Sequence, residues 1–201
     1  MKEYEPEFDQ MLFNLPLAGS TFKKVYYDEL MQRAVSKFVP ADDLVVPYTA
    51  TSLDDCESII HTVRMTENEL RKQQVGGFYK DIEVNPTHLN ETEAEKKERA
   101  LEGASKGRDD RMFNILECHV DIDLDGFEDV GQDGEPTGIK IPYIVTLEEG
   151  TRKVLSIRRN YEVGDPMKKK INYFVHFKFL PGLGFYGFGL IHMIGGLSRT
   201  A

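Results

Sequence analysis

The sequence has little cysteine and fewer basic than acidic residues. Its only two cysteines, Cys56 and Cys118, lack metal-ligand spacing, and we expect them to be small buried thiols in a reducing compartment. Lysine and arginine number 25 against 34 aspartates and glutamates, so the formal charge is −9. This balance argues against an electrostatic grip on nucleic acid, although segregated charge could still form a local basic face.

Catalytic motifs are also missing. The sequence has no nucleophile elbow, no P-loop and no paired catalytic carboxylates on a recognisable scaffold. The five histidines are scattered, and His61, His119 and His176 fall on predicted strands, where a hydrogen-bonded structural role is usual. The basic run Lys168–Lys170 falls in a predicted turn and indicates solubility rather than phosphate binding. We therefore expect a non-enzymatic protein without a cofactor or a metal.

No secretion signal is predicted. The first ten residues (MKEYEPEFDQ) are acidic, lack an apolar core and are expected to be loose. A cytoplasmic location is therefore expected. With 201 residues, 40% of them hydrophobic, the chain is long enough for one or two domains with a packed core.

What the first half of the sequence does contain is a series of short strand patterns. Aromatic and β-branched residues alternate between turn residues, which predicts an antiparallel meander over Lys23–Val46. Its strands are expected at 22–27, 34–39 and 44–46. Residues Ser52–Cys56 suit a short helical turn capped by Ser52, and Ser58–Met65 alternates as a strand.

A capping box gives the clearest helix signal. Thr66 is followed three residues later by Glu69, so each side chain can bond the other's backbone N–H, and a helix over Glu67–Gln74 is predicted. The glycine pair 76–77 is expected to end that helix.

The stretch 91–110 (ETEAEKKERALEGASKGRDD) has almost no large apolar residues. Thr92 and Glu95 form a second capping box, and residues 91–101 have good helix propensity. Because the stretch is polar all round, we expect a solvated helical excursion or a mobile loop.

Strand patterns return in the second half. Residues 113–124 place Leu116, Cys118, Val120, Ile122 and Leu124 on one face, which predicts a long half-buried strand. Further strands are predicted at 139–147, 153–159 and 171–179, and their turn signals indicate an antiparallel sheet of hairpins. The predicted fold class is therefore α+β, mainly antiparallel β-sheet with a few short helices. The predicted parts are residues 1–88, a meander plus a helix; 89–111, the polar excursion; and 112–201, an antiparallel sheet.

Asp121–Gly126 (DIDLDG) matches the opening of a calcium loop, with carboxylates at alternate positions and glycine at the sixth. Such a loop needs a bidentate glutamate at its twelfth position, which here is Gln132, and helices on both sides. An acidic strand edge that runs into a turn is the favoured interpretation. A calcium-binding β domain that uses Asp121, Asp123 and Asp125 is kept as an alternative.

The stretch 179–198 is the most unusual in the chain, because it carries no formal charge but holds six glycines and four aromatic residues. Gly182–Gly187 fits the dinucleotide pattern G-x-G-x-x-G. That pattern must open a βαβ unit, however, and Phe185 and Tyr186 inside it would crowd a pyrophosphate. The match is therefore interpreted as a coincidence of glycine density.

Such a stretch must be buried, inserted into a membrane or covered by a partner. Its glycines and Pro181 make a poor spanning helix, so a membrane-active protein using residues 179–197 is only an alternative. Burial or a subunit contact is favoured. The part from Phe185 to Ile194 is expected to be disordered in the isolated chain or to pair with a neighbouring copy. The residues expected to make the contact are Phe179, Leu183, Phe185, Tyr186, Phe188 and Leu190.

Seven segments, taken together, carry a resemblance to a known family. In chain order they are Gly19–Tyr26 (GSTFKKVY), Asp43–Tyr48 (DLVVPY), Ile60–Met65 (IHTVRM), Gly77–Tyr79 (GFY), Ile141–Tyr143 (IPY), Val154–Asn160 (VLSIRRN) and Phe179–Leu190 (FLPGLGFYGFGL). The series resembles the portal proteins of short-tailed, double-stranded DNA phages, the P22-like portal family. The resemblance runs from about Gly19 to Leu197, with a gap over the polar excursion.

The resemblance implies a structural, non-enzymatic subunit of the twelve-membered ring at one capsid vertex, through which DNA is packaged and ejected. Because family members are longer, it also implies that this chain is an internal fragment of the wing region, without the stem, clip and crown. The implied partners are other portal subunits, terminase, scaffolding, coat and tail-adaptor proteins, and genomic DNA that passes without sequence-specific binding. No membrane is implied. The implied locations are the virion and, during assembly, the bacterial host cytoplasm.

Overall fold

The computed structural model describes residues 4–28, 31–84, 112–131, 133–182 and 184–200. The predicted polar excursion at 91–110 lies outside these residues. The described elements in chain order are α1 (Tyr4–Ala18), β1 (Ser20–Asp28), β2 (Arg33–Pro40), the 3₁₀ turn η1 (Ala41–Asp43), β3 (Leu44–Val45), β4 (Ser58–Thr66), α2 (Glu67–Val75), β5 (Met112–Ile122), β6 (Ile141–Glu148), β7 (Val154–Arg159), β8 (Phe174–Lys178) and α4 (Leu190–Thr200).

The predicted fold class is confirmed. The strands form two antiparallel sheets, of order β2-β1-β8 and β3-β4-β5-β6-β7, accompanied by three short helices among the described residues. By contacts, the chain divides into two units. Unit 1 comprises residues 1–61, 118–144 and 159–201, and unit 2 comprises residues 62–117 and 145–158.

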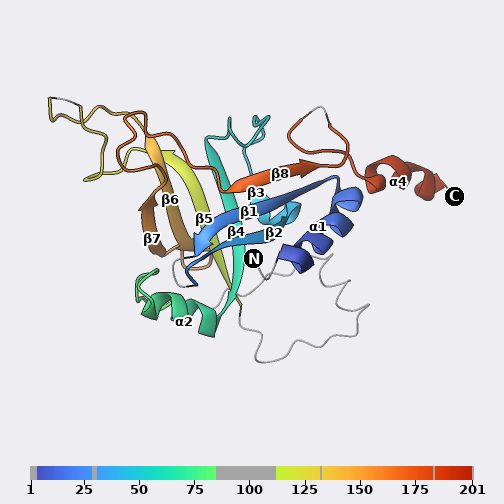
Figure 1. Ribbon diagram of the computed structural model, residues 1–201, viewed down its shortest axis with the longest axis horizontal. Helices are drawn as coiled ribbons and strands as arrows, with labels where there is room; N and C mark the ends of the chain where they lie inside the picture. The colour runs from blue at the N-terminus through green and yellow to red at the C-terminus, as the bar shows by residue number, and fades with distance from the viewer. Residues whose placement is uncertain (1–3, 29–30, 85–111, 132, 183, 201) are drawn as a thin grey trace. The chain divides into compact units, whose positions relative to one another are not determined.

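The three-stranded sheet of unit 1 joins distant parts of the sequence (Figure 1). β1 pairs with β2 on one side, with Phe22 opposite Val39, and with β8 on the other, with Phe22 opposite His176. The predicted meander over residues 23–46 is therefore wrong in its third strand. β3 leaves this sheet and pairs with β4, with Leu44 opposite His61, because Leu44 reaches the core from that position.

The core of unit 1 lies under the Phe22 face of this sheet. Phe22, Leu44 and Phe174 are buried there, together with the thiol of Cys56 and the ring of Phe185. Removing this apolar surface from water supplies the main free energy that holds the separated stretches together.

Helix α1 corrects the expectation that the first ten residues are loose. The helix packs on β1 and β2, and its tertiary contacts explain why it forms despite weak sequence signals. Glu7 accepts the backbone N–H of Phe38 at 2.6 Å. Tyr4 and Phe8 stack one helical turn apart and cover the ammonium group of Lys23. Sequence patterns do not report such long-range contacts.

Unit 2 contains helix α2, and the predicted capping box is present. Thr66 accepts the backbone N–H of Glu69, and the Glu69 carboxylate accepts the backbone N–H of Thr66 at 2.9 Å. The predicted helical turn at Ser52–Cys56 in unit 1 is not formed. Ser52 does accept the N–H of Asp55 at 3.3 Å, but the segment is a series of bends.

The deeply buried face of β5 is not the apolar face predicted from its alternation. Phe113, Ile115 and His119 are buried, whereas Leu116 and Val120 are only partly covered. Phe113 and Ile115 belong to the unit 2 core with residues of other elements, namely Leu70, Tyr79 and Leu155. Both faces of this strand are partly covered, so its polarity pattern did not identify the interior face.

Candidate interaction site on the C-terminal segment

After β8 the chain turns back on itself and returns to the junction between α1 and β1. Leu180 and Phe188 form an antiparallel bridge in which each N–H donates to the other's carbonyl, at 3.3 and 2.8 Å. Before the turn, the N–H of Phe179 donates to the carbonyl of Gly19 at 3.0 Å. The described residues of the segment 179–189 are thus bonded to one another and to Gly19, directly before β1.

The glycines of this segment permit unusually close backbone contact. A Cβ atom on Gly189 would lie 2.3 Å from the carbonyl oxygen of Leu17, and one on Gly187 would lie 2.5 Å from that of Gly19. Gly19 itself has a φ of 85°, a conformation that favours glycine. Close packing against the α1–β1 junction therefore gives the glycine density a structural reason, apart from any phosphate loop.

Phe185 anchors the segment in the core. It is 6% exposed and its ring centroid lies 4.7 Å from that of His176 and 5.9 Å from that of Phe22, both in stacked arrangements. The hydroxyl of the neighbouring Tyr186 donates to the carbonyl of Leu44 at 3.4 Å. Phe185 therefore takes an interior position, whereas Phe188 and Ile191, in the same expected contact region, are exposed.

The hydroxyl of Ser20 joins the segment to His176. Its Oγ accepts the N–H of Gly187 at 2.7 Å and lies 3.1 Å from Nε2 of His176. Burial, reinforced by the Lys178 ammonium, lowers the pKa of His176 to about 4, so the neutral ring can accept the Ser20 O–H. The spacing is that of a nucleophile and its base. However, Ser20 is 1% exposed, so a substrate cannot reach it.

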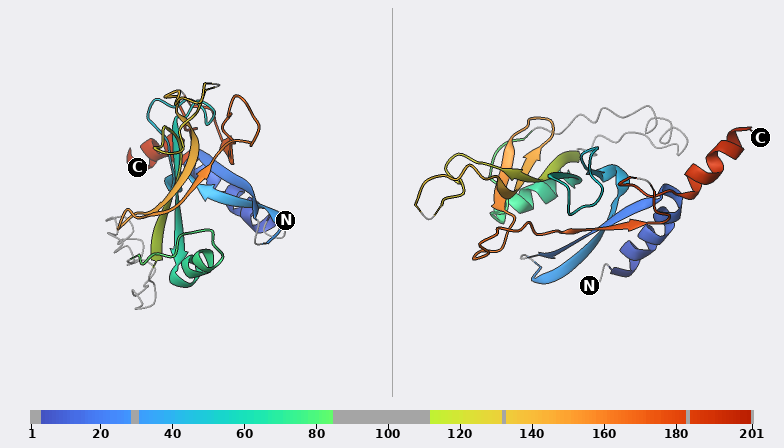
Figure 2. Two further views of the ribbon diagram at one scale, coloured as in Figure 1. Left: turned by 90° about the vertical axis from the view of Figure 1, so that its left-hand side faces the viewer. Right: turned by 90° about the horizontal axis from the view of Figure 1, so that it is seen from above.

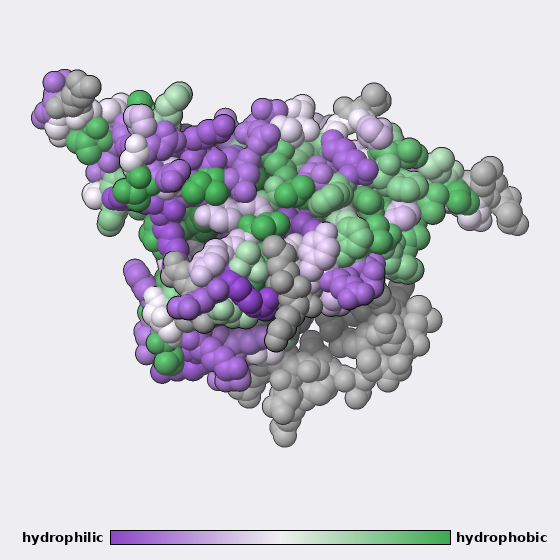
Figure 3. Space-filling view, in the orientation of Figure 1, coloured by the Kyte–Doolittle hydropathy of each residue, from purple (hydrophilic) through white to green (hydrophobic). Residues whose placement is uncertain are grey.

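Around this anchored segment lies an exposed apolar surface (Figure 3). Of the predicted contact residues, Phe179, Tyr186, Phe188 and Leu190 are 36–46% exposed, and Leu183 lies outside the described residues. Helix α4 adds further exposed apolar residues; it contacts α1 and projects beyond it (Figure 2). We call the following set the C-terminal apolar surface: Leu12, Phe13, Leu17, Phe179, Tyr186, Phe188, Leu190, Ile191, Met193 and Ile194.

Sequence reasoning missed the contributions of both helices to this surface. Leu190, Ile191 and Ile194 have helical spacing, and so do Phe13 and Leu17 in α1. The glycine pair 195–196 argued against a helix at Leu190–Ile194, because glycine is a poor helix former. The acidic residues before Met11 argued against a helix at the N-terminus, although Phe13 and Leu17 have helical spacing.

The described residues do not form the metal site that the calcium-binding alternative requires. Among the described parts of the chain, no three His, Cys, Asp or Glu side chains come together in a way that could hold a metal ion, and Asp121 lies within strand β5. His61 and His119 approach the ring of Phe174 edge-on, at 5.4 and 5.2 Å between centroids. None of the helices that the structure describes is long and apolar enough to cross a membrane.

When the chain is compared with protein-family models and with curated proteins, no family model and no curated protein matches it.

Proposed function

We propose that the chain is part of a structural subunit of a phage portal, the ring at the capsid vertex through which DNA is packaged and ejected. The proposal rests on the seven collinear segments, of which the longest, Phe179–Leu190, also contributes four residues to the C-terminal apolar surface. On this proposal the subunit contacts neighbouring portal subunits in a twelve-membered ring. It also contacts terminase, scaffolding, coat and tail-adaptor proteins, without catalysis of its own.

One observation supports a subunit contact at this surface more than any other. The exposed side chain of Phe188 stands on a backbone that is held by Phe185, Ser20 and the glycine contacts, and Ile191 follows in the helix that begins next to Gly189. A partner would therefore cover a preorganised apolar face and would lose little conformational entropy in doing so. Exposed apolar faces of this kind in soluble proteins mark interaction sites.

The test is the assembly state of the protein expressed from its complete gene. Native mass spectrometry and electron microscopy should find twelve-fold rings. The double variant Phe188→Ser with Ile191→Ser should shift the population to smaller species, because it removes apolar area from the contact. The control is Val75→Ser, which changes an exposed apolar residue in unit 2 and should leave the rings intact.

A protein that stays monomeric at every concentration and salt condition would contradict the portal proposal. Liposome flotation distinguishes the membrane alternative. If the wild-type chain floats with vesicles and the double variant does not, the C-terminal apolar surface binds lipid and the subunit contact is wrong. If neither floats, the membrane alternative is removed.

A further inference from the structure

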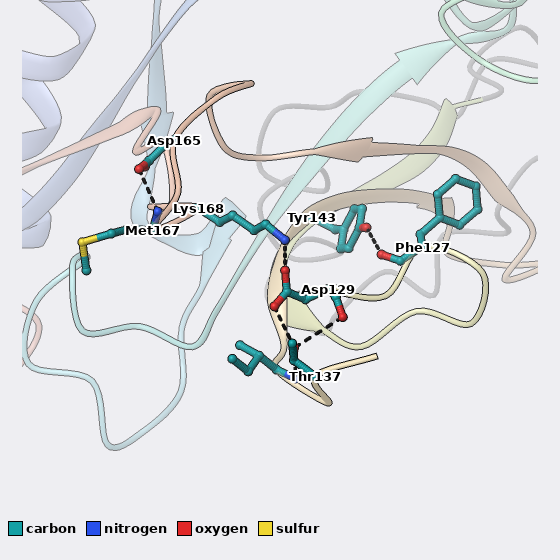
Figure 4. A network of polar contacts seen from close by, with 8 residues as sticks. Phe127, Asp129, Thr137, Tyr143, Asp165, Met167 and Lys168 are labelled. Atoms are coloured by element: carbon teal, nitrogen blue, oxygen red, sulfur yellow. Dashed lines mark hydrogen bonds and ion pairs between the residues drawn. The ribbon is translucent and has the colours of Figure 1, made fainter. Parts of the chain in front are cut away.

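Three loops of unit 1 are tied to one another by polar contacts. They are residues 46–57 between β3 and β4, residues 123–140, described except for Gln132, between β5 and β6, and residues 160–173 between β7 and β8. Lys170 Nζ donates to the carbonyl of Cys56 at 2.7 Å, and the Asn172 amide donates to the Asp54 carboxylate. Lys168 pairs with Asp129 (Figure 4). We call these loops together the three-loop surface.

Each loop is also braced from within. In loop 46–57, Asp55 accepts the hydroxyls of Thr51 and Ser52, both at 2.9 Å. Asp129 accepts the hydroxyl of Thr137 at 2.7 Å across the hairpin of loop 123–140. Asp165 accepts the N–H groups of Met167 and Lys169, both at 2.9 Å, and these bonds lower the pKa of its carboxyl. These bonds already order the loops in the free protein, so that binding a partner costs less conformational entropy.

The braced loops present apolar side chains to solvent. Tyr48 is fully exposed, and Val163 and Met167 in loop 160–173 are 85% and 87% exposed. Phe127 in loop 123–140 is more than half exposed, although its carbonyl accepts the hydroxyl of buried Tyr143 at 2.7 Å (Figure 4). Exposed apolar groups on a fixed backbone are typical of binding loops, where a rigid scaffold presents them to a partner.

The charge of the loops indicates the chemistry of that partner. The three loops hold eleven carboxylates and four lysines, a net charge of −7 within a chain of net charge −9. Two of the lysines, Lys168 and Lys170, are engaged by Asp129 and the Cys56 carbonyl. This sign disfavours nucleic acid and anionic lipid and complements a cationic surface.

We propose that the three-loop surface docks a basic protein segment that carries apolar side chains among its lysines or arginines. The apolar side chains of the segment would cover Tyr48, Phe127 and Met167, and its cations would face the carboxylates around them. This inference does not depend on the proposed portal function, because it uses a different set of residues from the C-terminal apolar surface.

Two peptides of equal charge test the proposal with the full chain. One is a 14-residue amphipathic peptide of lysine and leucine, and the other replaces every leucine with serine. At physiological salt, titration followed by NMR should give about tenfold tighter binding for the lysine–leucine peptide, because only that peptide has apolar anchors. The shifted amide resonances should cluster in loops 46–57, 123–140 and 160–173.

Matched variants separate apolar from electrostatic contributions. Tyr48→Ala with Met167→Ala should weaken binding of the lysine–leucine peptide about tenfold, whereas Val75→Ala, at an exposed site in unit 2, should not. Asp133→Asn with Glu135→Gln should weaken binding and reduce its salt dependence. The charge control is Glu5→Gln with Asp9→Asn, which removes two exposed carboxylates from α1 and should leave the affinity unchanged.

Three results would overturn the inference. The first is equal affinity for the two peptides, which would indicate unspecific attraction to an acidic chain. The second is a loss of affinity in the control variants as large as in the loop variants. The third is saturable calcium binding that displaces the peptide and shifts only the resonances of residues 121–133, which would assign the loops to a cation.

Discussion

At the scale of single residues, His176 links the core of unit 1 to the C-terminal segment. Its ring stacks against Phe22 and Phe185, and its Nε2 faces the Ser20 hydroxyl that holds Gly187. Burial favours the neutral ring over the charged one, and the neutral ring also suits the hydrogen bond from Ser20. The same group can therefore make stability depend on pH.

The pKa of His176 is lowered from 6.5 to about 4 in the folded protein, so the unfolded chain binds more protons between those two values. We expect this contribution to stability to be complete above pH 6.5, to decrease as the pH falls towards 4, and to stay constant below that. Urea unfolding of the wild type and His176→Gln across this range measures the difference. Carboxylates titrate in both proteins, so parallel pH profiles would contradict the prediction.

Lys23 is a second unusual residue, because it is 4% exposed. Its Nζ lies 4.0 Å from the ring centroid of Tyr4 and 4.9 Å from that of Phe8, and within the described part of the chain it has no hydrogen-bond acceptor. Cation–π contacts offset only part of the cost of removing an ammonium group from water.

We therefore expect Lys23→Met to leave the free energy of unfolding unchanged or to raise it by up to about 1 kcal/mol, because methionine keeps the apolar stem against both rings. Denaturant unfolding gives the value. Lys37→Met, at an exposed position of β2, is the control and should change it by less than about 0.5 kcal/mol. A loss of more than about 1 kcal/mol in Lys23→Met would show that the charge itself stabilises α1.

At the scale of elements, the segment between β8 and α4 depends on close contact between backbones. A methyl group on Gly189 would meet both the carbonyl of Leu17 and the N–H of Gly19. Neither atom can move without displacing the end of α1 or the start of β1. The position of α4 next to α1 therefore depends on this glycine.

Gly189→Ala is expected to destabilise the protein by about 1–3 kcal/mol, the usual cost of overpacking, and to make the chain after Lys178 more sensitive to limited proteolysis. Gly184→Ala is the matched control. No atom lies within 4 Å of its added Cβ, so its stability and cleavage pattern should match those of the wild type. Equal behaviour of the two variants would contradict the assigned role of Gly189.

At the scale of the whole molecule, the residues that the structure describes form two hydrophobic cores. Phe22 belongs to the core of unit 1 and Leu155 to that of unit 2, and both are fully buried. Neither unit is a continuous stretch of sequence, because each draws on two or three distant stretches. Each core can thus be weakened separately.

Phe22→Ala should cost about 3–5 kcal/mol and Leu155→Ala about 2–5 kcal/mol, since each leaves a cavity in a packed core. Hydrogen exchange followed by mass spectrometry should find the larger loss of protection in unit 1 for the first variant and in unit 2 for the second. If either variant exposes both units equally, the two cores unfold as one cooperative unit.

Unit 1 has two candidate interaction surfaces, which differ in charge. The C-terminal apolar surface is drawn largely from an uncharged stretch, whereas the three-loop surface combines exposed apolar side chains with most of the net negative charge. The two proposals about partners therefore make independent predictions. A substitution that weakens one contact should leave the other unchanged.

Much of the local structure could be predicted from the sequence by itself. The alternation of β4, the capping box of Thr66 and Glu69, and the strand-like residues of β1 and β2 are local signals, and each element formed within a few residues of its expected place. The uncharged, glycine-rich character of residues 179–198 likewise marked the segment that carries the C-terminal apolar surface. Local propensity and side-chain period are sufficient for such features.

Only the tertiary structure decided which distant segments meet. β8 lies beside β1, β3 pairs with β4, α1 forms against Lys23 and Phe38, and Phe185 enters the core while Phe188 stays exposed. The physical reason is that these outcomes depend on contacts between residues far apart in the chain. Their free energy comes from shared burial and close backbone approach, which no local pattern in the sequence reports.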